Sequence, residues 1–138
     1  MDKRVLVYQG YGLENIIRQT QFSIVSLLAQ IQAPSSLEVW IYTDRKDLFV
    51  SFFGSHPQIL YREITLDQVK KWRGSIDFIH RVKIEILQDA AKQFDGPLFY
   101  SDGDTYFLAD PTPLFSHVND RYSLMHIAET QLIDGKDP

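Results

Sequence analysis

Short apolar runs alternate with longer segments of helical spacing along this chain. The runs that predict strands are residues 4–9, 37–43, 58–64, 98–101 and 121–128. The segments that predict helices are residues 12–33, 44–53, 65–74 and 77–94. Strands separated by helices indicate a mostly parallel sheet with helices on both faces, a three-layer α/β/α fold.

Turn and capping residues mark the ends of these predicted helices. Pro34 stops the first helix, and Gly54 and Gly74 end the second and third. At the N-termini we expect three side chains to cap, namely Asp44, Thr65 (with Gln68 three residues on) and Asp77. The last helix is the most regular, because one face carries Ile79, Val82, Ile86, Ala90 and Phe94.

Composition limits the classes of protein that this chain belongs to. Its 138 residues suit one domain, and 44% hydrophobic residues indicate a packed core rather than disorder. The net charge of -4, with no basic run longer than Lys70–Lys71, argues against general nucleic-acid binding. The chain has no cysteine, no apolar run long enough to cross a membrane and no signal-peptide pattern. We therefore expect a cytoplasmic protein.

The candidate chemistry lies in "FYSDGDTYF", residues 99–107, where two carboxylates follow an apolar strand. Ligands of parallel sheets bind beyond the carboxyl ends of the strands, where Gly10–Gly12, Asp44, Asp102 and Asp104 are all expected. Two carboxylates this close need a cation or a shared proton between them. With phosphate oxygens and water they suit Mg²⁺ or Mn²⁺, and Gly103 lets the backbone bend around one ion.

Other interpretations of the Asp-Gly-Asp segment stay open from the residues alone. It is also the composition of a simple polar turn. A haloacid dehalogenase-like phosphatase would use Asp102 as the phosphorylated nucleophile and Asp104 as the general acid. That motif belongs on a first strand, however, and Lys136 is the one lysine that follows Asp104. A calcium-binding EF-hand fails, because Phe107 stands where that loop needs glycine.

The ordered segments "VLVYQGYG", "SIVSLL", "FIHRVKIEIL" and "FDGPLFYSDGDTYFLADPTPLF" resemble the GT-A fold glycosyltransferases that use nucleotide-diphospho-sugars. The resemblance runs from about Arg4 to Phe115 and is strongest to the retaining glycogenin and galactosyltransferase-like family. It implies a UDP-sugar as donor, an acceptor of unspecified kind (glycan, protein or small molecule), and Mn²⁺ or Mg²⁺ as cofactor. The competing class is a catalytically inert module that keeps the fold.

The resemblance also implies roles for individual residues. Asp102 and Asp104 would hold the divalent ion, and Asp102 would also touch the ribose or sugar. Tyr11 matches an aromatic that stacks on the base, its alternative being an exposed loop tyrosine. Arg81 matches an arginine that reaches the phosphates or the Asp pair, its alternative being a solvated helix arginine. We interpret Lys83 as a solvated charge.

Two histidines lie near apolar residues in the sequence. We interpret His80 and His126 as core or surface residues rather than metal ligands.

The resemblance places an acceptor site in a second half of the domain, so we expect residues 1–138 to be one nucleotide-sugar-binding unit, the N-terminal part of a larger GT-A domain. An exposed edge where that half would pack favours self-association, so a homo-oligomer is expected.

Overall fold

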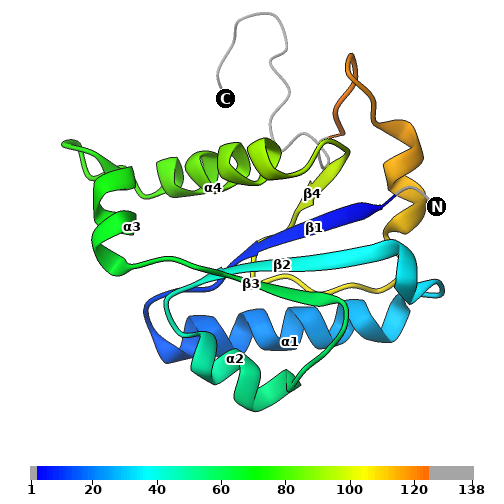
Figure 1. Ribbon diagram of the computed structural model, residues 1–138, viewed down its shortest axis with the longest axis horizontal. Coiled ribbons are helices and arrows are strands. Elements are labelled where there is room, and N and C mark those ends of the chain that lie inside the picture. Colours follow the sequence, from blue (N-terminus) through cyan, green and yellow to red (C-terminus); the bar gives the residue numbers. More distant parts are fainter. Residues whose placement is uncertain (1–2, 125–138) are drawn as a thin grey trace, which may run out of the picture.

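The computed structural model describes residues 3–124 and shows a parallel sheet between two helical layers (Figure 1). The strands are β1 (Arg4–Gln9), β2 (Leu37–Thr43), β3 (Ile59–Glu63) and β4 (Leu98–Tyr100). The helices are α1 (Glu14–Gln30), α2 (Lys46–Phe53), α3 (Leu66–Arg73) and α4 (His80–Gln93), and two 3₁₀ turns span Pro34–Ser36 and Thr112–His117. The predicted three-layer α/β/α class is confirmed.

The four strands run parallel in the order β3-β2-β1-β4. β1 lies inside the sheet, and its register pairs Val7 with Trp40 on β2 and with Tyr100 on β4. β1 and β2 read as near-continuous apolar runs because both of their faces are buried. The predicted bounds of these two strands are confirmed residue for residue.

Alternate residues of β1 divide the core into two layers. Leu6 and Tyr8 pack with α1 and α2, while Val5 and Val7 pack with α3 and α4. In α4 the buried positions are Val82, Ile86 and Ala90. Ile79, expected on the same face, is 53% exposed, because it precedes the first turn of α4.

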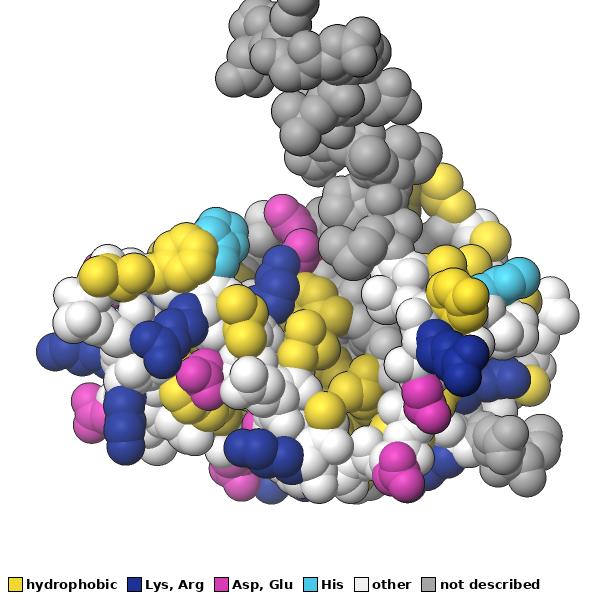
Figure 2. Space-filling view, turned by 90° about the horizontal axis from the view of Figure 1, so that it is seen from above, with side chains coloured by type: hydrophobic (Ala, Val, Ile, Leu, Met, Phe, Trp, Pro, Cys, Tyr) yellow, Lys and Arg dark blue, Asp and Glu magenta, His cyan; other side chains and the backbone are white. Residues whose placement is uncertain are grey.

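The outer face of the α3–α4 layer carries mixed charge. Figure 2 shows basic and acidic side chains interspersed there, with hydrophobic side chains and a histidine gathered at one end. The turn between α3 and α4 exposes Ile76 (78%) and Phe78 (47%), and His80 packs edge-on against Phe78 with ring centroids 5.4 Å apart. His126 lies outside the described residues.

Two of the three predicted N-caps are wrong. Thr65 Oγ1 does accept a hydrogen bond from the Gln68 amide, at 3.0 Å. Asp44 caps no helix, because α2 starts after Arg45 and the Asp44 carboxylate binds another loop. Asp77 has a left-handed backbone (φ 52°), and its carboxylate pairs with Arg73 Nε of the preceding helix at 2.7 Å.

The predicted fifth strand is wrong as far as it is described. Residues 119–122 form a tight turn closed by an isolated antiparallel bridge between Asn119 and Tyr122, and residues 123–124 are irregular. The Asn119 side chain accepts from the Arg121 amide at 2.9 Å, which closes the turn locally. The rest of that segment lies outside the described residues.

Candidate functional site

The loop after β1, residues 10–12, is built from close approaches that glycine permits. A Cβ at Gly10 would come within 2.9 Å of the Phe49 ring, so the backbone there packs directly on α2. Gly12 has φ +86°, a left-handed conformation that side chains disfavour. Its amide donates to Asp44 Oδ1 at 3.0 Å, so the end of β2 holds the loop that follows β1.

The Asp-Gly-Asp segment is a turn at the carboxyl end of β4. The Ser101 amide donates to the Val7 carbonyl at 3.1 Å, which carries the sheet pairing up to the turn. The Asp102 carbonyl accepts from the Thr105 amide (3.2 Å) and from Thr105 Oγ1 (2.6 Å). The segment is thus a polar turn, one of the predicted interpretations, and both carboxylates are exposed at the sheet edge where ligands bind.

Gly103 lies against α1 at Thr20. A Cβ on Gly103 would overlap Thr20 Oγ1, and the Thr20 methyl and hydroxyl groups also lie 3.2 Å from where a Gly10 Cβ would stand. Thr20 is fully buried, and its hydroxyl donates back to the Ile16 carbonyl at 2.9 Å. One threonine therefore packs against both the β1 loop and the Asp-Gly-Asp turn.

Lys83 is the cation that the structure places at the Asp pair. Its Nζ lies 3.0 Å from Asp102 Oδ1 and 3.3 Å from Oδ2, and 4.8 Å from the centre of the Tyr100 ring. The interpretation of Lys83 as a solvated charge is therefore wrong. Its spacing was the signal in the sequence, because Lys83 stands three residues before the buried Ile86 and seven before the buried Ala90 and so borders the face of α4 that packs on the sheet.

Tyr100 presents a buried hydroxyl next to Asp102. Burial raises the pKa of Tyr100 far above its ordinary value, and the neighbouring Asp102 carboxylate raises it further, so the hydroxyl stays protonated. Within residues 3–124, neither Tyr100 Oη nor the buried Gln9 Oε1 has a partner in hydrogen-bonding geometry. Both atoms are buried from solvent, and the Asp102 and Gln9 side chains lie close enough to the Tyr100 hydroxyl to act on its pKa.

Tyr11 and Arg81 differ in how closely they approach this group. Tyr11 is half-buried against the α3–α4 core layer, and burial raises its pKa while the Arg73 charge acts the other way. Arg81 pairs with Glu85 on its own helix, with Nε and Oε1 3.6 Å apart, and its guanidinium lies against Gly74. Among the described hydrogen bonds and ion pairs, Asp102 pairs with Lys83 and not with Arg81.

The donor set suits a metal ion that is shared with a ligand. Asp104 is exposed and forms no hydrogen bond or ion pair with residues 3–124. In this part of the chain no group of three or more His, Asp or Glu side chains converges on a metal position. Two carboxylates are half a coordination shell or less, and Mg²⁺ and Mn²⁺ commonly complete theirs with water and substrate phosphates. Asp102 and Asp104 fit such an ion.

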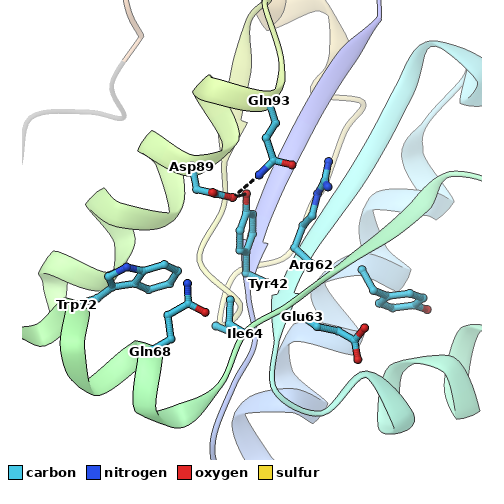
Figure 3. Close-up of a pocket in the computed structure, with 9 residues that line it drawn as sticks. Tyr42, Arg62, Glu63, Ile64, Gln68, Trp72, Asp89 and Gln93 are labelled. Atoms are coloured by element: carbon cyan, nitrogen blue, oxygen red, sulfur yellow. Dashed lines mark hydrogen bonds between the residues drawn. The ribbon is translucent and has the colours of Figure 1, made fainter.

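A hollow lies between β3, α3 and α4, and neither Asp102 nor Asp104 lines it (Figure 3). It has a volume of about 330 Å³, and Figure 3 shows Arg62 and Asp89 extending over the sheet from opposite sides of Tyr42. Asp89 Oδ2 accepts from the Tyr42 hydroxyl at 2.7 Å and from Gln93 Nε2 at 2.6 Å. The Arg62 guanidinium stacks on Trp40, 4.1 Å from the ring centre. We call this hollow the β3 groove.

The parallel sheet and its two helical layers define a Rossmann-like α/β fold. No family model matches the chain, and no curated protein matches it. Solved structures of TarS from S. aureus are similar, with a TM-score of 0.57 and 14% identity over 83% of this chain in one case. TarS residues 1–349, alone and in complex with UDP-GlcNAc, give TM-scores of 0.56 and 0.53 at 16% identity, each again over 83% of this chain.

These similarities show the fold, and they do not assign roles to the residues of the candidate site. The matched part spans 19% of the TarS chain and 31% and 30% of the two shorter TarS chains. The assignment to the glycogenin and galactosyltransferase-like family stays a prediction, as does the placement of the chain within a larger domain. Among the described residues no helix is long and apolar enough to cross a membrane.

Proposed function

We propose that this chain is the nucleotide-sugar-binding part of a glycosyltransferase that uses a UDP-sugar donor with Mn²⁺ or Mg²⁺. The observation that carries the proposal is the exposed Asp102–Asp104 pair at the carboxyl edge of the sheet, beside the loop that holds Tyr11. A protein of the same fold was crystallised with UDP-GlcNAc, which supports a uridine nucleotide as the ligand.

In this proposal the side chains bind and orient the donor. Asp102 and Asp104 hold the ion, which supplies positive charge to the diphosphate leaving group when bound. Lys83, which lies beside Asp102, supplies a second positive charge near the diphosphate. Tyr11 provides a half-buried aromatic surface for the base. Arg81 stays a candidate for the phosphates once its weak pairing with Glu85 is exchanged.

The test is a thermal-melt titration with UDP in the presence and absence of Mn²⁺. A ligand that binds only the native state raises the melting temperature by mass action. At 100 times its Kd it adds about 2.7 kcal/mol to the free energy of unfolding. We expect a rise that needs both UDP and Mn²⁺ and that disappears in Asp104→Asn. Because Asp104 is exposed and makes no hydrogen bond or ion pair with residues 3–124, this variant is expected to fold normally.

A matched control distinguishes the site from general acidity. Asp95 is also exposed but precedes β4, at the opposite end of that strand. Asp95→Asn should keep the full rise in melting temperature. Absence of any rise with UDP and Mn²⁺ in the folded protein would contradict the proposal. Hydrolysis of an aryl phosphate that is lost in Asp102→Asn would instead favour the phosphatase, and absence of any nucleotide preference would favour the inert module.

A further inference from the structure

Lys83 occupies the oxygens of Asp102 that a divalent cation would need. Its Nζ is 3.0 Å from one carboxylate oxygen and 3.3 Å from the other, so a single ammonium group bridges both. The same ammonium group also lies over the Tyr100 ring, 4.8 Å from its centre. Asp104, by contrast, has no partner among residues 3–124.

A cation that arrives alone therefore meets opposition at this site. It must displace Lys83 from Asp102, and any position near both Asp102 and Lys83 places like charges a few ångströms apart. The side chain of Lys83 is 32% exposed and that of Asp102 is 49% exposed, so water weakens this opposition without removing it. Binding of the ion alone is expected to be weak.

A diphosphate changes this balance. It carries several negative charges, and a lysine ammonium on its flexible four-carbon stem binds phosphate as a mobile point charge. If Lys83 turns from Asp102 to the diphosphate, both Asp102 oxygens become free and the ammonium no longer opposes the ion. Through this movement, binding of the nucleotide strengthens binding of the ion, and binding of the ion strengthens binding of the nucleotide.

We propose that Lys83 couples metal binding to nucleotide binding by holding Asp102 until a diphosphate takes its place. The proposal rests on the proposed function, because it concerns the same two ligands. It adds that the two ligands bind with positive cooperativity and that Lys83 is a main source of it. By linkage, the factor by which UDP strengthens Mn²⁺ binding equals the factor by which Mn²⁺ strengthens UDP binding.

The experiment measures free Mn²⁺ by its electron paramagnetic resonance signal, with and without UDP. In Lys83→Met, which keeps the length and loses the charge, Mn²⁺ alone should bind about tenfold more tightly than in the unmodified chain. The strengthening of Mn²⁺ binding by UDP should fall by a similar factor. Lys83→Arg keeps the positive charge and should keep most of the coupling.

Lys92→Met is the control for net charge, because Lys92 is exposed near the other end of the same helix. It should leave Mn²⁺ binding unchanged, and circular dichroism of each variant reports whether it is folded. If Lys83→Met binds Mn²⁺ alone no better than the unmodified chain, while UDP and Mn²⁺ still bind together, the coupling is overturned and the proposed function stands. If Mn²⁺ binds to neither protein even with UDP, both are overturned.

Discussion

The β3 groove and the Asp102 site each place a carboxylate near a tyrosine of the sheet, on α4 in the first case and after β4 in the second, and the two carboxylates have different partners. In the groove, Asp89 accepts from the Tyr42 hydroxyl and the Gln93 amide, both neutral donors. At the site, Asp102 is held by the charged Lys83, and the Tyr100 hydroxyl lies near it without hydrogen-bonding geometry. Asp89 is bound by neutral groups of the fold. The partner of Asp102 is the charged Lys83, which other anions also attract.

This difference separates a carboxylate that stabilises the fold from one that binds a ligand in the proposed function. Burial raises the pKa of Tyr42 far above its ordinary value, and its hydrogen bond to the Asp89 carboxylate raises it further. That bond joins α4 to β2 across the core layer and needs no exchange of charge. A lysine that bridges an exposed carboxylate stabilises the fold little, because most of its attraction is screened by water. The Asp102 site is therefore free to change partners.

The largest predicted effect separates these two carboxylates by stability. Asp89→Ala should lower the free energy of unfolding by about 2 kcal/mol, because it removes two hydrogen bonds to a charged group and leaves the Tyr42 hydroxyl without its acceptor. Asp102→Ala should change it by less than about 1 kcal/mol. Urea unfolding of both variants checks the difference, and Tyr42→Phe alone and with Asp89→Ala isolates the Tyr42–Asp89 term. Equal losses at the two positions would break the comparison.

A smaller effect is predicted at Asp44, whose carboxylate accepts a hydrogen bond from a backbone amide. Asp44→Ala should cost about 1 kcal/mol of unfolding free energy, because the Gly12 amide loses its acceptor. Hydrogen exchange at the Gly12 amide should speed up in the same variant. Asp44→Asn keeps an oxygen acceptor and serves as the control. Unchanged exchange in Asp44→Ala would show that other contacts hold the loop.

The smallest predicted effect is a pH dependence at Asp110, which holds two backbone amides. Its burial raises the pKa, but bonds from the Thr112 and Gln32 amides, with the Arg4 charge, bring the pKa below its ordinary value of 3.8. The stabilisation is thus fully present above the unfolded pKa and is lost as the pH falls through the folded one.

Acid titration of stability in Asp110→Asn tests this sign. The unmodified chain should lose its advantage over the variant, less than about 1 kcal/mol, between about pH 5 and pH 2. The variant lacks the titrating group and should show a shallower decline in unfolding free energy over the same range. An advantage that grows as the pH falls would mean that the carboxyl is bound in its protonated form.

Much of the fold was predictable from the sequence, for a physical reason. β1 and β2 are buried on both faces, so their apolar runs end where burial ends, and their bounds were correct to the residue. Thr65 also behaved as predicted, because its cap involves residues of one turn. Local chemistry and tertiary structure agree at these positions.

The incorrect assignments involve side chains whose partners lie outside their own segment. Asp44 was predicted to cap the helix that follows it, yet it accepts from Gly12, 32 residues earlier. Asp77 turned to Arg73 on the preceding helix. Lys83 meets Asp102 from a different element, 19 residues away. Side-chain choices of this kind depend on packing, which a residue pattern does not contain.

Thr20 shows a further consequence of this packing. It faces Gly10 and Gly103 from α1, on the side of the sheet opposite α4, so the two loops at the sheet edge share one point of support. A larger side chain at position 20 would therefore press on the Tyr11 loop and on the carboxylate turn at the same time. A molecule bound across both loops would sense that single substitution at both of its contacts.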